Sequence, residues 1–209
     1  MSDVERTVTV VGHGAAETVP DVMHVDLGVE CHAYSVGVSL QDAGAAVADL
    51  IATLTEAGVP SRDIQTSHLS VQPRYGDHGP NGAPIIGYTS SHTMTVVLRD
   101  LERVPTVLAA AARAGGDAAR IQNVSFAISD DTGLAAAARD AAFADAVSRA
   151  EQYAMLAGAR LGAVQSVTEE PVSDVRPLYA ARAMAAPMPI QAGSSSVSAS
   201  VTVVFYLDD

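Results

Sequence analysis

The chain has no lysine, no tryptophan and only one cysteine, and each of these gaps removes a class of function. All 12 basic residues are arginine, so a Schiff-base lysine, a phosphate-loop lysine and a lysine general base are excluded. Cys31 has no partner cysteine within the chain. This excludes an intramolecular disulfide and is compatible with a reducing compartment.

Positive charge and aromatic surface are also scarce. The formal net charge is −12 and aromatic residues make up 4% of the sequence. Nucleic acids and anionic membranes need an attractive basic surface, and bases or sugars need aromatic stacking platforms. No apolar run approaches the roughly 18 residues that span a bilayer. We therefore expect no nucleic-acid partner and no membrane insertion.

The length and hydrophobic content favour one folded domain. The chain has 209 residues, of which 48% are hydrophobic, and this suffices for a sizeable core. Residues 1–6 are acidic and lead directly into a strand pattern, without the basic start and long apolar centre of a signal peptide. We predict a single domain over residues 1–209, located in the cytoplasm.

Three helix ends share one pattern. Ala57-Gly58, Ala114-Gly115 and Ala157-Gly158 each close a helical stretch and precede a strand, because a left-handed glycine commonly ends a helix. Alternating polar and apolar residues mark the other strands. These patterns predict an α+β fold, a two-layer sandwich in which three helices cover one face of a mixed, mainly antiparallel sheet of about seven strands.

Two strands show clean alternation. Every second residue from 23 to 31 is apolar, and residues 197–207 alternate in the same way. We expect the last strand to lie inside the sheet. The alanine-rich helix before Ala157 should approach the strands closely, because a methyl face lets the helix axis lie near them.

The opposite face of the strand at residues 23–31 has two interpretations. Side chains two residues apart on a strand lie about 6 to 7 Å apart, close enough to share an ion. The candidate metal ligands are His24, Asp26 and His32, with His68 and His92 as further candidates on a long hairpin. The alternative is a solvated or partner-facing strand without a ligand.

Two segments rich in proline or glycine, residues 73–84 and 171–196, interrupt the regular pattern. Long irregular segments within a domain are usually functional or disordered, and methionine supplies adaptable contact area. We predict that these loops contact other copies of the chain. The candidate interface residues are Tyr75, Tyr179, Met184 and Met188.

No catalytic or cofactor-binding motif is apparent. The patterns Gly-x-Ser-x-Gly, His-Glu-x-x-His and Cys-x-x-Cys are absent from the sequence. Gly12-His13-Gly14 lacks the third glycine and the following helix of a dinucleotide-binding loop, so we interpret it as a turn. Asp77 and His78 could act as an acid and a base, but no pattern selects them. We expect no enzyme activity and no cofactor.

The order and spacing of several short patterns resemble the SIMPL-domain family. They are Val11-Gly12-x-Gly14, Pro20-Asp21, Ala57-Gly58-Val59, Asp63-Ile64-Gln65-Thr66, Pro73-x-Tyr75, Ile86-x-Tyr88, Arg99-Asp100-Leu101, Ala138-Arg139 with Ala141-x-x-Ala144, and Val201-x-Val203-x-Phe205-x-Leu207. The resemblance implies a single α+β domain. It also implies that bacterial members are commonly exported, some as periplasmic or outer-membrane antigens, and that the animal namesake interacts with a signalling kinase.

The resemblance further implies homo-oligomers, including large ring or cage-like assemblies, and it carries over no catalytic residues. We therefore predict a non-enzymatic structural or interaction protein that assembles with itself. The alternative is a small-molecule or metal-binding module that uses the strand histidines and carboxylates. This sequence departs from the exported members in showing no signal peptide, so a cytoplasmic location stays our expectation.

Overall fold

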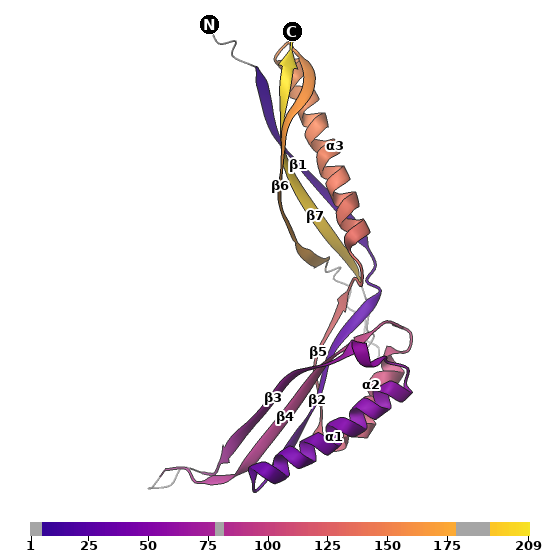
Figure 1. Cartoon of the computed structure of the whole chain (residues 1–209), viewed down its shortest axis with the longest axis vertical. Helices are drawn as coiled ribbons and strands as arrows, with labels where there is room; N and C mark the ends of the chain where they lie inside the picture. The colour runs from indigo at the N-terminus through magenta and orange to yellow at the C-terminus, as the bar shows by residue number, and fades with distance from the viewer. Residues whose placement is uncertain (1–5, 78–81, 179–192) are drawn as a thin grey trace, which may run out of the picture. The chain divides into compact units, whose positions relative to one another are not determined.

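The computed structural model describes residues 6–77, 82–178 and 193–209, with the backbone alone for residues 171–178. These residues form three α-helices and seven mainly antiparallel strands, which confirms the predicted α+β class (Figure 1). The chain divides into two compact units. We call residues 1–20 with 128–209 the terminal unit, and residues 21–127 the central unit.

The seven strands lie in two sheets, where the sequence suggested one. The terminal sheet has the order β1-β7-β6 and the central sheet the order β3-β4-β2-β5. The terminal strands are β1 (Thr7–Thr18), β6 (Arg160–Leu178) and β7 (Ser194–Asp208). The central strands are β2 (Val22–Ala33), β3 (Ile64–Tyr75), β4 (Ile85–Leu98) and β5 (Ala119–Ala127). The chain leaves β1 for β2 through Pro20, which has no N–H to continue a ladder.

In the central unit, α1 (Val36–Glu56) and α2 (Val104–Gly115) cover one face of the sheet (Figure 1). The predicted apolar face of β2 is confirmed, because its alternate residues from Met23 to Val29 are buried against both helices. Cys31 packs at the margin of this core. Burial raises the pKa of the Cys31 thiol, and the nearby Asp42 raises it further. The side chain is therefore a small apolar group, as predicted.

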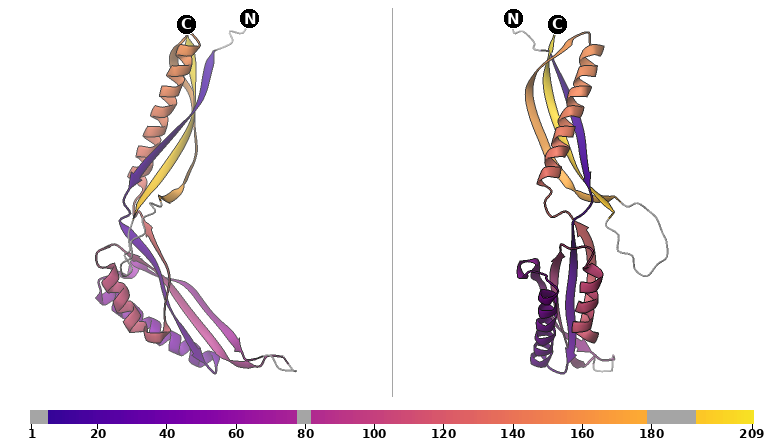
Figure 2. Two further views of the ribbon diagram at one scale, coloured as in Figure 1. Left: turned by 180° about the vertical axis from the view of Figure 1, so that it is seen from behind. Right: turned by 90° about the vertical axis from the view of Figure 1, so that its right-hand side faces the viewer.

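In the terminal unit, α3 (Thr132–Leu156) runs along β1 and β7 (Figure 2). Its sheet-facing stripe consists of alanines spaced by four residues, all buried: Ala138, Ala142, Ala146, Ala150 and Ala154. They pack against apolar residues of β7 between Ala199 and Phe205. The predicted close approach of this helix and the interior position of the last strand are both confirmed.

Gly12-His13-Gly14 lies in the middle of β1 and is not the turn that the sequence suggested. A Cβ atom on Gly12 would overlap the backbone oxygen of Ala142, and one on Gly14 would overlap that of Ala138. The two glycines therefore make room for the helix backbone. The motif serves helix-to-strand packing.

Side chains of α3 also cover the outer edge of β1. The Asp145 carboxylate accepts a hydrogen bond from the backbone N–H of His13 (2.8 Å), and the Arg149 guanidinium donates to the carbonyl of Val11 (3.0 Å). The His13 N–H, followed by the Arg149 side chain, lowers the pKa of Asp145. These bonds occupy polar groups that an edge strand otherwise offers to another chain.

The element boundaries differ from the prediction at two places. Backbone pairing of β6 continues to Leu178, with register shifts, so residues 171–178 belong to a strand and not to the irregular segment predicted from residue 171. An edge strand tolerates such interruptions. The second helix also ends one residue later than predicted. Gly58 and Gly158 have the expected positive φ of 92° and 67°, whereas at the second helix end Gly116 (φ 50°) replaces Gly115.

Candidate functional site

The open face of the central sheet carries a polar groove with a volume of about 530 Å³. The helices cover the other face, so alternate strand residues point into this groove. Six serine or threonine side chains, two glutamines, His68 and the carboxylates of Asp26 and Glu30 line it. The lining contains no phenylalanine, tyrosine, tryptophan, aliphatic or arginine side chain. Its chemistry is that of hydrogen bonding with a negative charge.

A β-bulge at Ser67 determines which residues of β3 face the groove. The pairing of β3 with β4 shifts between Thr66 and His68, so the alternation of faces changes phase there. The Ser67 hydroxyl donates to the carbonyl of Thr93 (3.3 Å), which holds the bulge against β4. His68 then lines the groove, although Thr66 two residues earlier bonds to the ring of His92 (3.2 Å).

Asp26 is a half-buried carboxylate on β2. Its Oδ1 accepts a hydrogen bond from the Thr95 hydroxyl on the neighbouring strand (2.8 Å). In the part of the chain that the structure describes, no arginine or histidine forms an ion pair with it. Asp26 is thus a negative charge whose only side-chain partner is a neutral hydroxyl.

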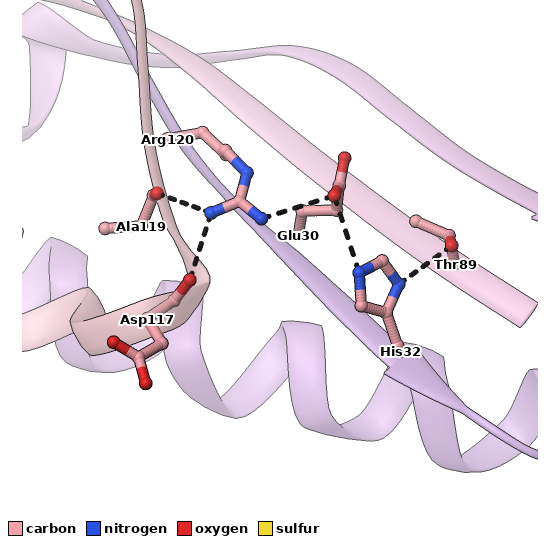
Figure 3. A network of polar contacts seen from close by, with 6 residues as sticks. All are labelled: Glu30, His32, Thr89, Asp117, Ala119 and Arg120. Carbon is pink, nitrogen blue, oxygen red and sulfur yellow. Dashed lines mark hydrogen bonds and ion pairs between the residues drawn. The ribbon is translucent and has the colours of Figure 1, made fainter.

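Glu30, the second carboxylate of the groove, is held in a network (Figure 3). Its Oε1 accepts a hydrogen bond from Nη2 of Arg120 (3.3 Å) and lies 3.6 Å from Nε2 of His32. Nη1 of Arg120 donates to the carbonyls of Asp117 and Ala119, and Nδ1 of His32 lies 2.8 Å from the Thr89 hydroxyl. Arg120 therefore offsets the charge of Glu30, whereas Asp26 has no such partner.

The structure does not bring the candidate metal ligands together. His24, Asp26 and His32 lie along one face of β2, and its two histidines are separated by about 27 Å of extended strand. Over the described ranges, no group of three or more His, Cys, Asp or Glu side chains could hold a metal ion. His68 lines the groove. Ser91 and Thr93 line it as well, and because successive strand residues point to opposite faces, His92 lies on the other face of the sheet.

The predicted interface residues divide into two groups. Tyr75 lies at the end of β3 with 59% of its surface exposed. Tyr179, Met184 and Met188 lie outside the described residues, as does His78 of the suggested acid and base pair. Asp77 is exposed at the end of the same hairpin.

Sequence reasoning singled out Asp26 and His68 but not the groove itself. The hydroxyls at positions 89, 91, 93 and 95 were a visible signal, because they recur with the period of a strand. Their grouping with β2 and β5 depends on strand order, which no local pattern contains.

Of the helices in the described parts of the chain, none has the length and apolar character to cross a membrane.

Comparisons with known proteins identify relatives in Brucella and in Escherichia coli. The chain is 29% identical over 221 residues to the 26 kDa periplasmic immunogenic protein of Brucella melitensis, covering 98% of this chain and 86% of that protein. The protein of the same name from Brucella abortus matches to the same extent. The uncharacterized protein YggE of Escherichia coli is 29% identical over 175 residues, covering 84% of this chain and 70% of YggE.

The names of the Brucella relatives contradict the predicted cytoplasmic location. That prediction rested on residues 1–6 and on a single cysteine, and neither determines the compartment. A lone cysteine has no partner within the chain to oxidise in any compartment. The family model SIMPL, described as a protein of unknown function (DUF541), matches residues 8–205. The chain therefore belongs to the SIMPL (DUF541) family.

Proposed function

We propose that this chain is a non-enzymatic, self-assembling protein of the bacterial periplasm, whose copies join through an apolar cluster at the end of the central sheet. We call this cluster the strand-end cluster. It consists of Tyr34, Tyr75, Ile85 and Ile86. The observation that carries the proposal is the exposure of these four large side chains at the ends of the neighbouring strands β2, β3 and β4.

The residues of the strand-end cluster lie at the ends of β2, β3 and β4. Tyr75 pairs with Ile85 across β3 and β4. A Cβ atom on the adjacent Gly76 would meet Ile86 at 2.8 Å, and one on Gly87 would lie 3.9 Å from the Cα of Tyr34. Tyr34 itself is 93% exposed. Contiguous exposed apolar surface is typical of a protein contact site, and tyrosine is enriched at such interfaces.

The terminal unit offers a second apolar surface. α3 lies over β1 and β7, which leaves Val164 and Val167 of β6 exposed on the helix-covered side. Phe143 of α3 lines a hollow of about 220 Å³ beside Val167. A chain with two separate contact surfaces can join two neighbours, as a closed ring or cage requires. This supports the ring or cage inferred from the family resemblance.

The periplasmic part of the proposal follows the names of the two Brucella relatives. Assembly suits the composition, because the side chains at the strand-end cluster are uncharged in a chain of net charge −12. Depletion of charge at the centre of a contact surface reduces the repulsion and desolvation that acidic copies would otherwise meet.

The experiment compares two tyrosines of matched exposure. Tyr75 is 59% exposed and Tyr153 on α3 is 57% exposed. Size exclusion with light scattering should show that Tyr75→Ser, and more strongly Tyr75→Ser with Ile85→Ser, shifts the protein to lower mass. Tyr153→Ser should leave the mass unchanged. Equal effects of both tyrosine substitutions, or no effect of the double substitution, would contradict the proposal that copies join through the strand-end cluster.

A further inference from the structure

We propose that the groove on the open face of the central sheet binds a linear polyamine, with one ammonium group on Asp26 and a second at Glu30. The ligand class follows from what the lining offers, which is two carboxylates, hydroxyl and amide groups, one histidine and no arginine. The site is separate from the strand-end cluster, so it does not depend on self-assembly.

The charge of Asp26 is the first argument for a positively charged ligand. A half-buried carboxylate is stable when a cation or several hydrogen bonds compensate its charge. The other partly buried carboxylates of the described chain have arginine partners, such as Asp63 with Arg99 and Asp145 with Arg149. Among the described residues, the side-chain partner of Asp26 is the neutral hydroxyl of Thr95 alone. A bound ammonium group would supply the missing positive charge and donate to the free oxygen, Oδ2.

Thr93 supplies an independent reason. Its side chain lines the groove, yet the residue is only 6% exposed. The Ser67 hydroxyl donates to the carbonyl of Thr93, and across the described ranges the Thr93 hydroxyl has no partner. Among the described residues the buried side-chain polar atom without a partner is Oγ of Ser200, so the Thr93 hydroxyl is open to the groove, where a donor from a ligand can reach it. The hydroxyl belongs to the strand that flanks Asp26.

The remaining lining selects among ligands. Ser70, Ser91, Gln72 and Gln122 make no side-chain hydrogen bond to other described residues, so their oxygens are free to accept from a chain of N–H groups. An anion would find no arginine in the lining. A sugar or nucleobase would find no phenylalanine, tyrosine or tryptophan ring on which to stack. A divalent metal would need converging ligands, which the described residues do not form.

The spacing of the carboxylates suits an extended ligand. Asp26 and Glu30 lie on one face of β2 and are separated by about 13 Å along the strand. The groove volume of about 530 Å³ falls in the usual range for small-molecule sites. Arg120 and His32 both approach Oε1 of Glu30, which leaves Oε2 for the second ammonium group. Two charged anchors would hold a flexible chain along β2, beside the groove residues of β3 and β4.

The test is calorimetric titration of the full chain with spermidine at low salt. Asp26→Asn keeps an oxygen that can accept from Thr95 but removes the charge, and it should weaken binding about tenfold or more, as expected for one charge-assisted hydrogen bond. Thr93→Val, which keeps the shape, should weaken it about threefold to tenfold. The matched control is Asp49→Asn on the exposed side of α1, with the same change in net charge and an expected effect below about twofold.

Several results would overturn the proposal. They are no binding of spermidine at millimolar concentration, equal weakening by Asp26→Asn and Asp49→Asn, or equally tight binding of a neutral polyol such as sorbitol. Backbone amide NMR shifts provide a second readout, and they should concentrate on β2, β3 and β4. Shifts confined to other elements would place the ligand elsewhere. Thermal melting of each variant confirms that it is folded before titration.

Discussion

Arg99 and Asp63 form a two-point ion pair that ties β4 to the short turn before β3. Nε of Arg99 lies 2.8 Å from Oδ2 of Asp63, and Nη2 lies 2.9 Å from Oδ1. Asp63 is only 5% exposed, so its charge depends on this partner. The hydrogen bonds from Arg99 lower the pKa of Asp63, and the same contact raises the pKa of Arg99.

Arg99→Gln should destabilise the central unit, because it removes the ion pair and both hydrogen bonds of a buried carboxylate. We expect the melting temperature to fall by about 5 °C or more. Arg113→Gln is the control, since Arg113 lies on α2 and has no ion pair among the described residues. Differential scanning calorimetry of both variants makes the comparison. Equal melting temperatures for the two variants would contradict the role of the pair.

Acidification should remove the contribution of Asp63 to stability. Its pKa is lowered in the folded state, so its stabilising effect is fully present above the unfolded pKa of about 3.9 and is lost as the pH falls through the lower folded pKa. The difference in urea midpoint between wild type and Asp63→Asn should be constant from about pH 7 to 5 and shrink below about pH 4. A difference in urea midpoint that grows on acidification would contradict a lowered pKa of Asp63 in the folded state.

Gly12→Ala should disrupt the packing of α3 on β1, because the added methyl would overlap the backbone of Ala142. We expect a loss of about 2 kcal/mol or more in the free energy of unfolding. Gly44→Ala in α1 should have the opposite sign, since a Cβ there meets nothing within 4 Å and alanine stabilises a helix interior by about 1 kcal/mol. Urea unfolding measures both. A neutral Gly12→Ala would contradict the close approach.

Ser39 and Ser90 form a buried hydroxyl pair between α1 and β4, with 2.7 Å between their oxygens. Ser90→Ala or Ser39→Ala alone should cost about 1 kcal/mol of unfolding free energy, because each breaks the pair. Both together should cost less than the sum, since no partner is left behind. A double-mutant cycle by urea unfolding tests this, and strict additivity would show that the pair contributes no coupling.

Features governed by local period could be predicted from the sequence. The apolar face of β2, the interior position of β7 and the alanine stripe of α3 each follow from residues that recur every two or four positions. The helix ends at Gly58 and Gly158 follow from the backbone freedom of glycine.

Features that depend on the pairing of distant residues could not be predicted from the sequence. Gly12 and Ala142 are far apart in sequence, so the reason for the glycine is visible only once α3 lies on β1. The same holds for the division into two sheets and for the groove, which needs the bulge at Ser67 and the central strand order. Local periodicity contains neither the order of strands nor the register of their pairs.

The most direct test of the central proposal is the solution mass of the wild-type protein. One chain weighs 21.4 kDa. Light scattering after size exclusion at micromolar concentration should give a whole-number multiple of this mass, and native mass spectrometry should resolve the same subunit number. A mass of 21.4 kDa at every concentration tested would contradict self-assembly.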